Sequence, residues 1–170
     1  MSEQNPQVVL ETSMGTITVE LFREQAPITV KNFLSYVKEG FYDGLIFHRV
    51  IKEFMIQGGG LNEELEQKKP KFAIKNEASN GLSNKRGTLA MDRTALVDSA
   101  TCQFFINVVD NPFLDHQGKQ QDRFGYCVFG QVLEGMDVVD EIRSVKTGKQ
   151  KGHTDVPVEP VFIKTARVIA

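Results

Sequence analysis

Hydrophobic and polar residues alternate strictly near the start of the chain. Over residues 16–21, Ile17, Val19 and Leu21 fall on one face, and the residues between them are polar. This pattern is typical of a strand with one buried face. A shorter apolar run at residues 8–10 precedes it, and the intervening residues 13–15 suit a turn. The N-terminal part is therefore predicted to form a β-hairpin.

The hydrophobic period changes after Pro27, a residue that suits the first turn of a helix. Gly40 can end the helix. The apolar positions follow at the i, i+3, i+4, i+7 spacing of an amphipathic helix: Val30, Phe33, Leu34 and Val37. A second helix is predicted from residue 136 to about residue 145, because Val138, Ile142 and Val145 share one face.

The other apolar runs are short and predict strands. They lie at residues 45–47, 54–56, 72–74, 88–91, 104–109, 127–129 and 161–169. Residues 144–160 are polar, with two prolines and several lysines, and predict a loop. Many short strands with only two helices favour a mostly antiparallel sheet that closes or packs on itself. A doubly wound α/β fold is disfavoured because strands and helices do not alternate.

Composition and charge narrow the class of protein. The 170 residues fit a single domain spanning 1–170. A content of 41% hydrophobic and 25% charged residues is ordinary for a globular domain. With 20 basic against 22 acidic residues, the net charge of −2 disfavours nucleic acid as a partner. We expect no membrane span and no signal peptide, and therefore a cytoplasmic location. The absence of heptads favours a monomer.

Cysteines and histidines suggest no cofactor chemistry. Cys102 and Cys127 lie in apolar runs without a C-x-x-C spacing, so buried thiols are favoured over a disulfide or a redox role. His48, His116 and His153 lack metal-ligand spacing, and the last two are expected to be exposed in polar loops. No metal or other cofactor is predicted.

Known catalytic loops are also missing from the sequence. There is no G-x-S-x-G nucleophile elbow. The glycines at residues 58–60 lack the Lys and Ser/Thr of a phosphate loop. They predict a tight turn or a close approach of the backbone to another group.

Residues 47–59 (Phe-His-Arg-Val-Ile-Lys-Glu-Phe-Met-Ile-Gln-Gly-Gly) are harder to explain as structure alone. Met55 and Gln57 share a face if this part is a strand. Arg49 could reach the same face from the neighbouring strand. The three side chains would then place a polar pair at the edge of a hydrophobic pocket. A surface arginine and a strand-end glutamine are the alternative.

This stretch resembles the signature of the cyclophilin family, F-H-R-x-I/V-x-x-F-M-x-Q-G-G, with no gap. The resemblance extends over nearly the whole chain. Further matching segments are residues 26–33, 87–91, 99–106, 128–132 and 135–139. Residues 90–94 and 126–130 are similar to the bacterial cytoplasmic branch.

The resemblance implies a mainly β fold, a closed eight-stranded antiparallel β-barrel capped by two α-helices. The implied activity is peptidyl-prolyl cis–trans isomerisation, which assists protein folding. That reaction twists an amide bond against a barrier of about 18–20 kcal/mol and breaks no bond. It therefore needs neither a nucleophile nor a metal, in agreement with the motifs that are missing.

The resemblance also implies a role for each site residue. Arg49 would stabilise the twisted amide, and Gln57 would orient Arg49 and bond the substrate backbone. The catalytic set is Arg49, Gln57 and Phe54. Gln103 would bond the substrate backbone, and His48 would be structural beneath the site. The proline pocket would comprise Phe54, Met55, Phe105 and Leu114, with Phe113 and Tyr126 at its rim; from the strand pattern alone, Met55 and Phe105 are ordinary core residues.

Four positions depart from the common family pattern. Phe113 stands where many members have Trp, which removes an indole donor, so weak binding of cyclosporin-type macrocycles is expected. Tyr126 stands where many members have His. Asp92 and Arg93 replace a common Ala-Asn pair at the substrate contact, and their charge is expected to alter sequence preference.

The expected partners are proline-containing peptides and unfolded or folding proteins. A second reading remains open: a proline-binding chaperone or scaffold module in which turnover is incidental. The presence of Arg49, Phe54, Met55, Gln57 and Phe105 together favours the enzyme.

Overall fold

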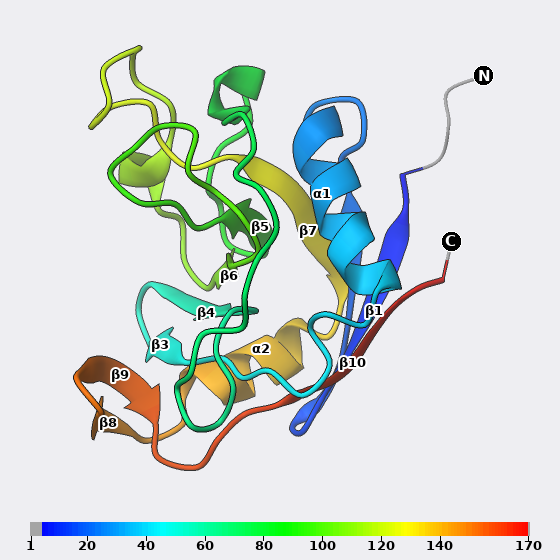
Figure 1. Ribbon diagram of the computed structural model, residues 1–170, viewed down its shortest axis with the longest axis vertical. Helices are drawn as coiled ribbons and strands as arrows, with labels where there is room; N and C mark the ends of the chain where they lie inside the picture. Colours follow the sequence, from blue (N-terminus) through cyan, green and yellow to red (C-terminus); the bar gives the residue numbers. More distant parts are fainter. Residues whose placement is uncertain (1–4, 170) are drawn as a thin grey trace.

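The computed structural model describes residues 5–169, which form one large antiparallel sheet, one small hairpin and two α-helices (Figure 1). The strands of the large sheet are β1 (Gln7–Thr12), β2 (Gly15–Leu21), β3 (Arg49–Ile51), β4 (Met55–Gly58), β5 (Thr88–Met91), β6 (Phe104–Asn107), β7 (Val128–Glu134) and β10 (Ile163–Val168). The small hairpin is β8 (Thr147–Gln150) and β9 (His153–Pro157). The helices are α1 (Pro27–Lys38) and α2 (Met136–Arg143), and two 3₁₀ turns, η1 (Ala78–Asn80) and η2 (Pro112–Leu114), lie between strands.

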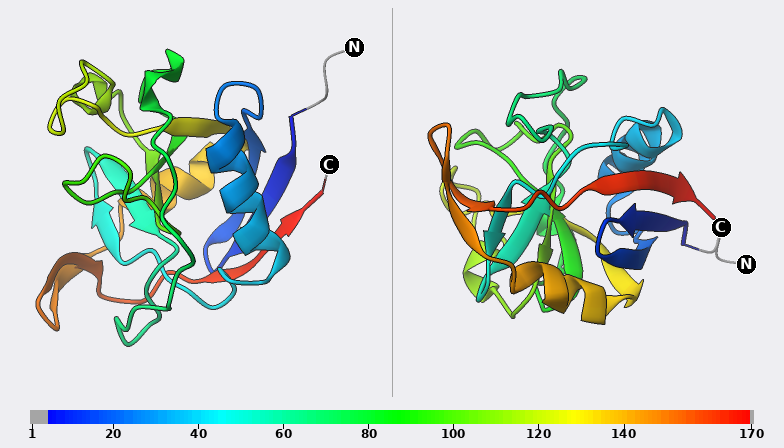
Figure 2. Two further views of the ribbon diagram at one scale, coloured as in Figure 1. Left: turned by 45° about the horizontal axis from the view of Figure 1, so that its top comes forward. Right: turned by 90° about the horizontal axis from the view of Figure 1, so that it is seen from below.

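The eight strands follow the order β10-β1-β2-β7-β5-β6-β4-β3, and every neighbouring pair is antiparallel. The sheet curls strongly (Figure 2, right), and both α1 and α2 contribute buried side chains to the one main core on its inner side. The mainly β, two-helix prediction is confirmed.

Closure of the barrel was overstated by the sequence prediction. The edge strands β10 and β3 do not pair with each other in the described sheet. Residues 45–47, predicted as a strand, contribute only a single bridge between Ile46 and Phe162. The reason is that this segment divides its backbone hydrogen bonds. Phe47 donates to the carbonyl of Val161, whereas Ile46 donates to that of Leu61.

Helix α1 forms as its apolar period predicts. Its buried side chains include Val30, Phe33, Leu34 and Val37, and Pro27 occupies the first turn. The first backbone N–H groups need an acceptor because they have no partner within the helix. The carboxylate of Glu77 supplies it, accepting from the N–H of Thr29 at 2.7 Å and from that of Ile28 at 3.3 Å.

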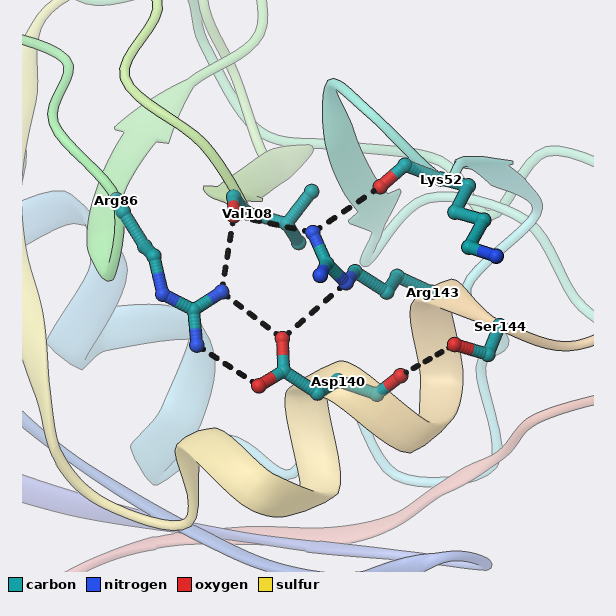
Figure 3. A network of polar contacts seen from close by, with 6 residues as sticks. All are labelled: Lys52, Arg86, Val108, Asp140, Arg143 and Ser144. Carbon is teal, nitrogen blue, oxygen red and sulfur yellow. Dashed lines mark hydrogen bonds and ion pairs between the residues drawn. The ribbon is translucent and has the colours of Figure 1, made fainter.

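Helix α2 ends at Arg143, two residues earlier than predicted, and is tied to the sheet by ion pairs (Figure 3). Arg86 holds both carboxylate oxygens of Asp140, at 2.9 and 2.8 Å, and also donates to the carbonyl of Val108 at 2.9 Å. Arg143 pairs with the same carboxylate at 3.2 Å. This network fixes α2 against the segment that follows β6 and carries Val108. The pairing, chiefly with Arg86, lowers the pKa of the Asp140 carboxyl group.

Side-chain alternation divides the sheet into two apolar layers. Ile56, Phe104 and Ile106 point into the main core beneath the helices. Their neighbours Met55 and Phe105 point the other way and join a separate buried cluster with Ala90, Leu114 and Val128. Met55 and Phe105 are thus buried, as the strand pattern predicts, but in this second cluster and not in the main core.

Two predicted segments differ from the structure. Residues 72–74 form no strand, apart from a bridge between Ile74 and Ala100. Residues 144–160 are not a loop but contain the β8–β9 hairpin. Lys151 and Gly152 at its tip both have positive φ, 48° and 83°, as a two-residue hairpin turn requires. The strands are short and largely polar, so their sequence carries little alternation.

The structure also bears on the predictions for cysteines, glycines and histidines. Cys102 and Cys127 are buried free thiols, and burial raises the pKa of Cys127 to about 11. Gly58 approaches backbone closely, because a Cβ added there would lie 2.6 Å from the carbonyl oxygen of Ile46. His153 is exposed as expected, whereas His116 is half-buried. Within residues 5–169, no helix has the length and apolar character needed to cross a membrane.

Candidate active site

A row of four residues crosses the outer face of the sheet. Arg49 on β3 lies opposite Gln57 on β4, Gln57 lies opposite Phe105 on β6, and Phe105 lies opposite Ala90 on β5. Residues directly opposite each other in an antiparallel pair share a face. The sequence expectation that Arg49 reaches the face of Gln57 from the neighbouring strand is thus met by the register.

A chain of hydrogen bonds starts at the Arg49 end of this row and continues from Gln57 to Gln103. The Arg49 guanidinium donates to Oε1 of Gln57 at 3.5 Å, at the long limit for such a bond. The Gln57 amide donates in turn to Oε1 of Gln103 at 2.9 Å. Gln57 is only 6% exposed, whereas Arg49 is exposed. The buried amide is therefore held in one orientation, and the guanidinium beside it remains accessible to a ligand.

A small pocket of about 50 Å³ lies beside this chain. Eight residues predicted from the sequence line it together: Arg49, Phe54, Met55, Gln57, Asp92, Phe105, Leu114 and Tyr126. Its floor is rigid because Met55, Phe105 and Leu114 are buried in the second apolar cluster. The pocket thus combines an apolar floor with a cationic donor at one edge.

Aromatic side chains form the rim. Phe113 and Leu114 come from the same 3₁₀ turn, η2, but Leu114 points into the pocket and Phe113 is 64% exposed. The Phe113 ring stacks on Phe54 with centroids 5.7 Å apart. Tyr126 meets Phe105 edge-on at 5.8 Å. Phe113 therefore lies outside the pocket wall, as the rim position predicted for it requires.

Asp92 places a carboxylate in the pocket wall, directly after β5. Its backbone N–H donates to the carbonyl of Gln103 at 3.0 Å, which continues the ladder past the end of the strand. Burial raises the pKa of this carboxyl group, while the Arg93 backbone, the charge of Arg49 and the Gln57 side chain act in the opposite direction.

Arg93 is placed outside this pocket and is occupied by the backbone of two loops. Its guanidinium donates to the carbonyls of Thr94, Ala95, Gln121 and Gly125 at 2.9–3.1 Å. It also lies 5.5 Å from the centre of the Tyr126 ring. These contacts hold residues 121–126 against residues 93–95. A larger cavity of about 570 Å³ opens between the two loops.

His48 is 7% exposed and lies behind the site, adjacent to Arg49 in the chain. Within residues 5–169, its Nδ1 has no hydrogen-bond partner, and its ring lies edge-on to that of His153 at 6.5 Å. Burial, followed by the nearby His153 and Arg49, lowers the pKa of His48 to about 4. The imidazole is therefore neutral near pH 7, and its position agrees with the structural role expected for it.

Sequence reasoning missed a buried asparagine network beside the pocket. Asn111 donates to the carbonyl of Phe54 at 3.0 Å and to Oδ1 of Asn107 at 2.8 Å. Asn107 donates to Oδ1 of Asn84 at 3.0 Å, and Asn84 donates to Asp115 at 3.0 Å. The network connects the pocket residue Phe54 to the turn carrying Leu114. These residues are scattered along the chain, so no local pattern revealed them.

The arrangement suits the binding of a compact apolar group next to a carbonyl. The floor takes the apolar group, and the guanidinium of Arg49 can donate to an adjacent carbonyl oxygen, since it is charged at any working pH and presents donors in a fixed fork. A proline within a peptide has this combination of ring and carbonyl. The fold and the pocket together suit a protein that binds such a segment of a peptide on the outer face of a curled antiparallel sheet.

Comparisons with known proteins identify the family. A family model described as cyclophilin type peptidyl-prolyl cis-trans isomerase/CLD matches residues 7–168. "Peptidyl-prolyl cis-trans isomerase cyp18" of Streptomyces antibioticus is 56% identical over 162 residues, covering 95% of this chain and 98% of the relative. "Peptidyl-prolyl cis-trans isomerase B" of Escherichia coli (strain K12) is 56% identical over 161 residues, with the same shares covered. The chain belongs to the cyclophilin-type peptidyl-prolyl cis–trans isomerase family.

Solved structures support the same conclusion. A cyclophilin-type isomerase of Cryptosporidium parvum has a TM-score of 0.78 and 25% identity, covering 98% of both chains. A crystal structure of the same protein in the presence of the dipeptide Ala-Pro has a TM-score of 0.76, with 26% identity, and covers 96% of this chain and 99% of that one. The chain is accordingly an enzyme with peptidyl-prolyl cis–trans isomerase activity.

Proposed function

We propose that isomerisation takes place in the pocket beside Arg49, by a non-covalent mechanism. The observation that carries the proposal is the hydrogen-bonded chain Arg49–Gln57–Gln103 along the edge of an apolar pocket. The pocket takes the proline ring, and Arg49 donates to the carbonyl oxygen of that proline. The acyl group before proline is then free to rotate.

Electrostatics explains how this geometry lowers the barrier. As the C–N bond twists, amide resonance is lost and the prolyl nitrogen becomes pyramidal. The Arg49 donors, held at the carbonyl of proline, favour that state. A contact accelerates the reaction only to the extent that it binds the twisted amide more tightly than the planar one. Donors fixed in advance, as Arg49 is by Gln57, need no reorganisation during the reaction.

Each further residue has a binding or positioning role in this proposal. Phe54, Met55, Phe105 and Leu114 hold the ring by apolar contact, and Gln57 and Gln103 bond the substrate backbone. Tyr126 contacts the substrate at the rim, where many family members have histidine; no proton is transferred, so a phenol suffices there.

Phe113 at the rim lacks the indole N–H found at this position in many family members. We therefore expect cyclosporin-type macrocycles to bind weakly, and nanomolar inhibition would contradict this expectation.

The proposal extends to the biological context. Residues 1–170 act as a single domain, as a monomer in the cytoplasm, on proline-containing peptides and on unfolded or folding proteins. Nucleic acid is not a partner, a view supported by the net charge of −2.

A proline-binding module with incidental turnover is the alternative, and one assay separates it from the enzyme. The cis-to-trans rate of a short Ala-Pro peptide is measured with the wild-type protein and with Arg49→Ala. We expect fast turnover that falls by about 10²–10³-fold in kcat/KM when the donor is removed. Circular dichroism of both proteins checks that the fold is retained. Peptide binding without acceleration by the wild-type protein would overturn the enzymatic proposal.

A further inference from the structure

The carboxylate of Asp92 has no part in the mechanism above, although it stands in the wall of the pocket. An ionised carboxylate beside an apolar surface is costly unless other groups compensate it. Arg49 and Gln57 face it, and the Arg93 backbone contacts it. Among the described residues, no ion pair joins Asp92 to a cation within 4 Å, so its charge remains available to a ligand.

The order of strands indicates which part of a substrate meets Asp92. Across the site the strands run β3-β4-β6-β5, so Arg49 and Asp92 stand on opposite sides of the pocket floor formed by Met55 and Phe105. If Arg49 holds the carbonyl of proline, the chain after proline leaves toward β3. The residue before proline then lies over the end of β5, next to Asp92.

We propose that Asp92 is a specificity-determining residue that favours substrates with Lys or Arg immediately before proline and disfavours those with Asp or Glu there. The proposal deepens the function proposed above and rests on it. A long cationic side chain can reach the carboxylate while its apolar stem covers the pocket rim.

The neighbouring positive charges stay the same with and without the Asp92 carboxylate. Arg93 is committed to four backbone carbonyls, and Arg49 is turned to Gln57. Contributions to the electrostatic potential add, so removal of the Asp92 charge makes the site one unit more positive whatever its neighbours do. At a separation of about 6 Å and an effective dielectric constant of about 40, one unit charge changes kcat/KM about tenfold.

The preference should also depend on pH. The groups that face Asp92 are Arg49 from β3, Gln57 from β4, and the adjoining Arg93, with the buried Cys102 nearby. Because burial raises its pKa, the Asp92 carboxyl group takes up a proton at a higher pH than an exposed aspartate. The selectivity for a cation is then lost as the pH falls, while a lysine side chain in the substrate stays charged.

The test uses three peptides that differ only before proline: Ala-Lys-Pro-Phe, Ala-Ala-Pro-Phe and Ala-Glu-Pro-Phe. For the wild-type protein we expect kcat/KM about tenfold higher for the Lys peptide than for the Ala peptide, and a lower value for the Glu peptide. In Asp92→Asn the Lys-to-Ala ratio should be about tenfold lower than in the wild-type protein. The ratio within each protein is the readout, so a general change in activity does not affect it.

A second measurement keeps the proposal testable if Asp92→Asn does not fold. In the wild-type protein, the Lys-to-Ala ratio should decline as the pH is lowered from 7 and as salt is raised. A Lys-to-Ala ratio near one at pH 7 and low salt, with all three peptides turned over, would overturn the role of Asp92 alone. Turnover of none of the peptides would overturn the proposed function together with it.

Discussion

Gly60 offers a test of whether the orientation of Gln57 matters for activity. A Cβ added at Gly60 would lie 2.5 Å from Cγ and 2.7 Å from Nε2 of Gln103. Gly60 does not have a positive φ, so its backbone accepts alanine. The substitution Gly60→Ala therefore acts by pushing away the Gln103 side chain, whose Oε1 accepts the Gln57 amide at 2.9 Å.

The magnitude follows from that single hydrogen bond. Its net worth is about 1 kcal/mol, which corresponds to a roughly fivefold decrease in kcat/KM if the whole bond serves catalysis. The assay is peptide isomerisation, together with thermal unfolding to confirm that Gly60→Ala is folded. Gly148→Ala is a matched control, because a Cβ there meets nothing within 4 Å and its φ is not positive.

A double-mutant cycle separates this route from general damage. In a Gln103→Ala background the obstacle and the hydrogen bond are both absent, so Gly60→Ala should change kcat/KM by less than twofold. Unchanged activity of Gly60→Ala alone would refute the reasoning. An equal loss with and without Gln103 would also refute it, since the effect would then not pass through that side chain.

Three further substitutions test other parts of the structure. The pKa of His48 is lowered to about 4, so the unfolded chain binds the proton first as the pH falls. The free energy of unfolding should therefore drop by about 3 kcal/mol between pH 6.5 and 4. Urea unfolding of His48→Gln should lack that drop. Asp140→Asn breaks a partly exposed network with two arginines and should lower the free energy of unfolding by about 1 kcal/mol, whereas a change below 0.2 kcal/mol would contradict its role in fixing α2. Phe105→Leu should destabilise the fold by less than about 1.5 kcal/mol, but should raise KM for proline peptides because it removes an aromatic floor; an unchanged KM would contradict the assigned pocket.

The sequence predicted those parts of the fold whose periodicity is local. Helix α1 and the β1–β2 hairpin have clear apolar patterns, and their bounds agree closely with the prediction. The β8–β9 hairpin was missed because its short strands are mostly polar, and its turn residues Lys151 and Gly152 lack a flanking alternation. The prediction of a strand at residues 45–47 was wrong because the backbone hydrogen bonds of this segment are divided between two distant segments, which no local pattern encodes.

The site was predictable to a different degree. Strand alternation alone placed Met55 and Gln57 on one face, and the register brought Arg49 to it. The division between the inner and outer layers was not predictable, since adjacent Phe104 and Phe105 are equally apolar and only the packing of α1 and the outer cluster tells them apart. The hydrogen bonds from Arg93 to the carbonyls of Gln121 and Gly125 join loops that are distant in sequence. The sequence around Arg93 therefore gave no sign of these contacts.

The central claim is that Arg49 binds the twisted amide more tightly than the planar one. The most direct test measures kcat and the dissociation constant of one proline peptide for the wild-type protein and for Arg49→Lys, which keeps the charge and loses the fork of donors. We predict that kcat falls at least tenfold while the dissociation constant changes less than threefold. An unchanged kcat with weaker binding would contradict the account, because Arg49 would then contribute to ground-state binding alone.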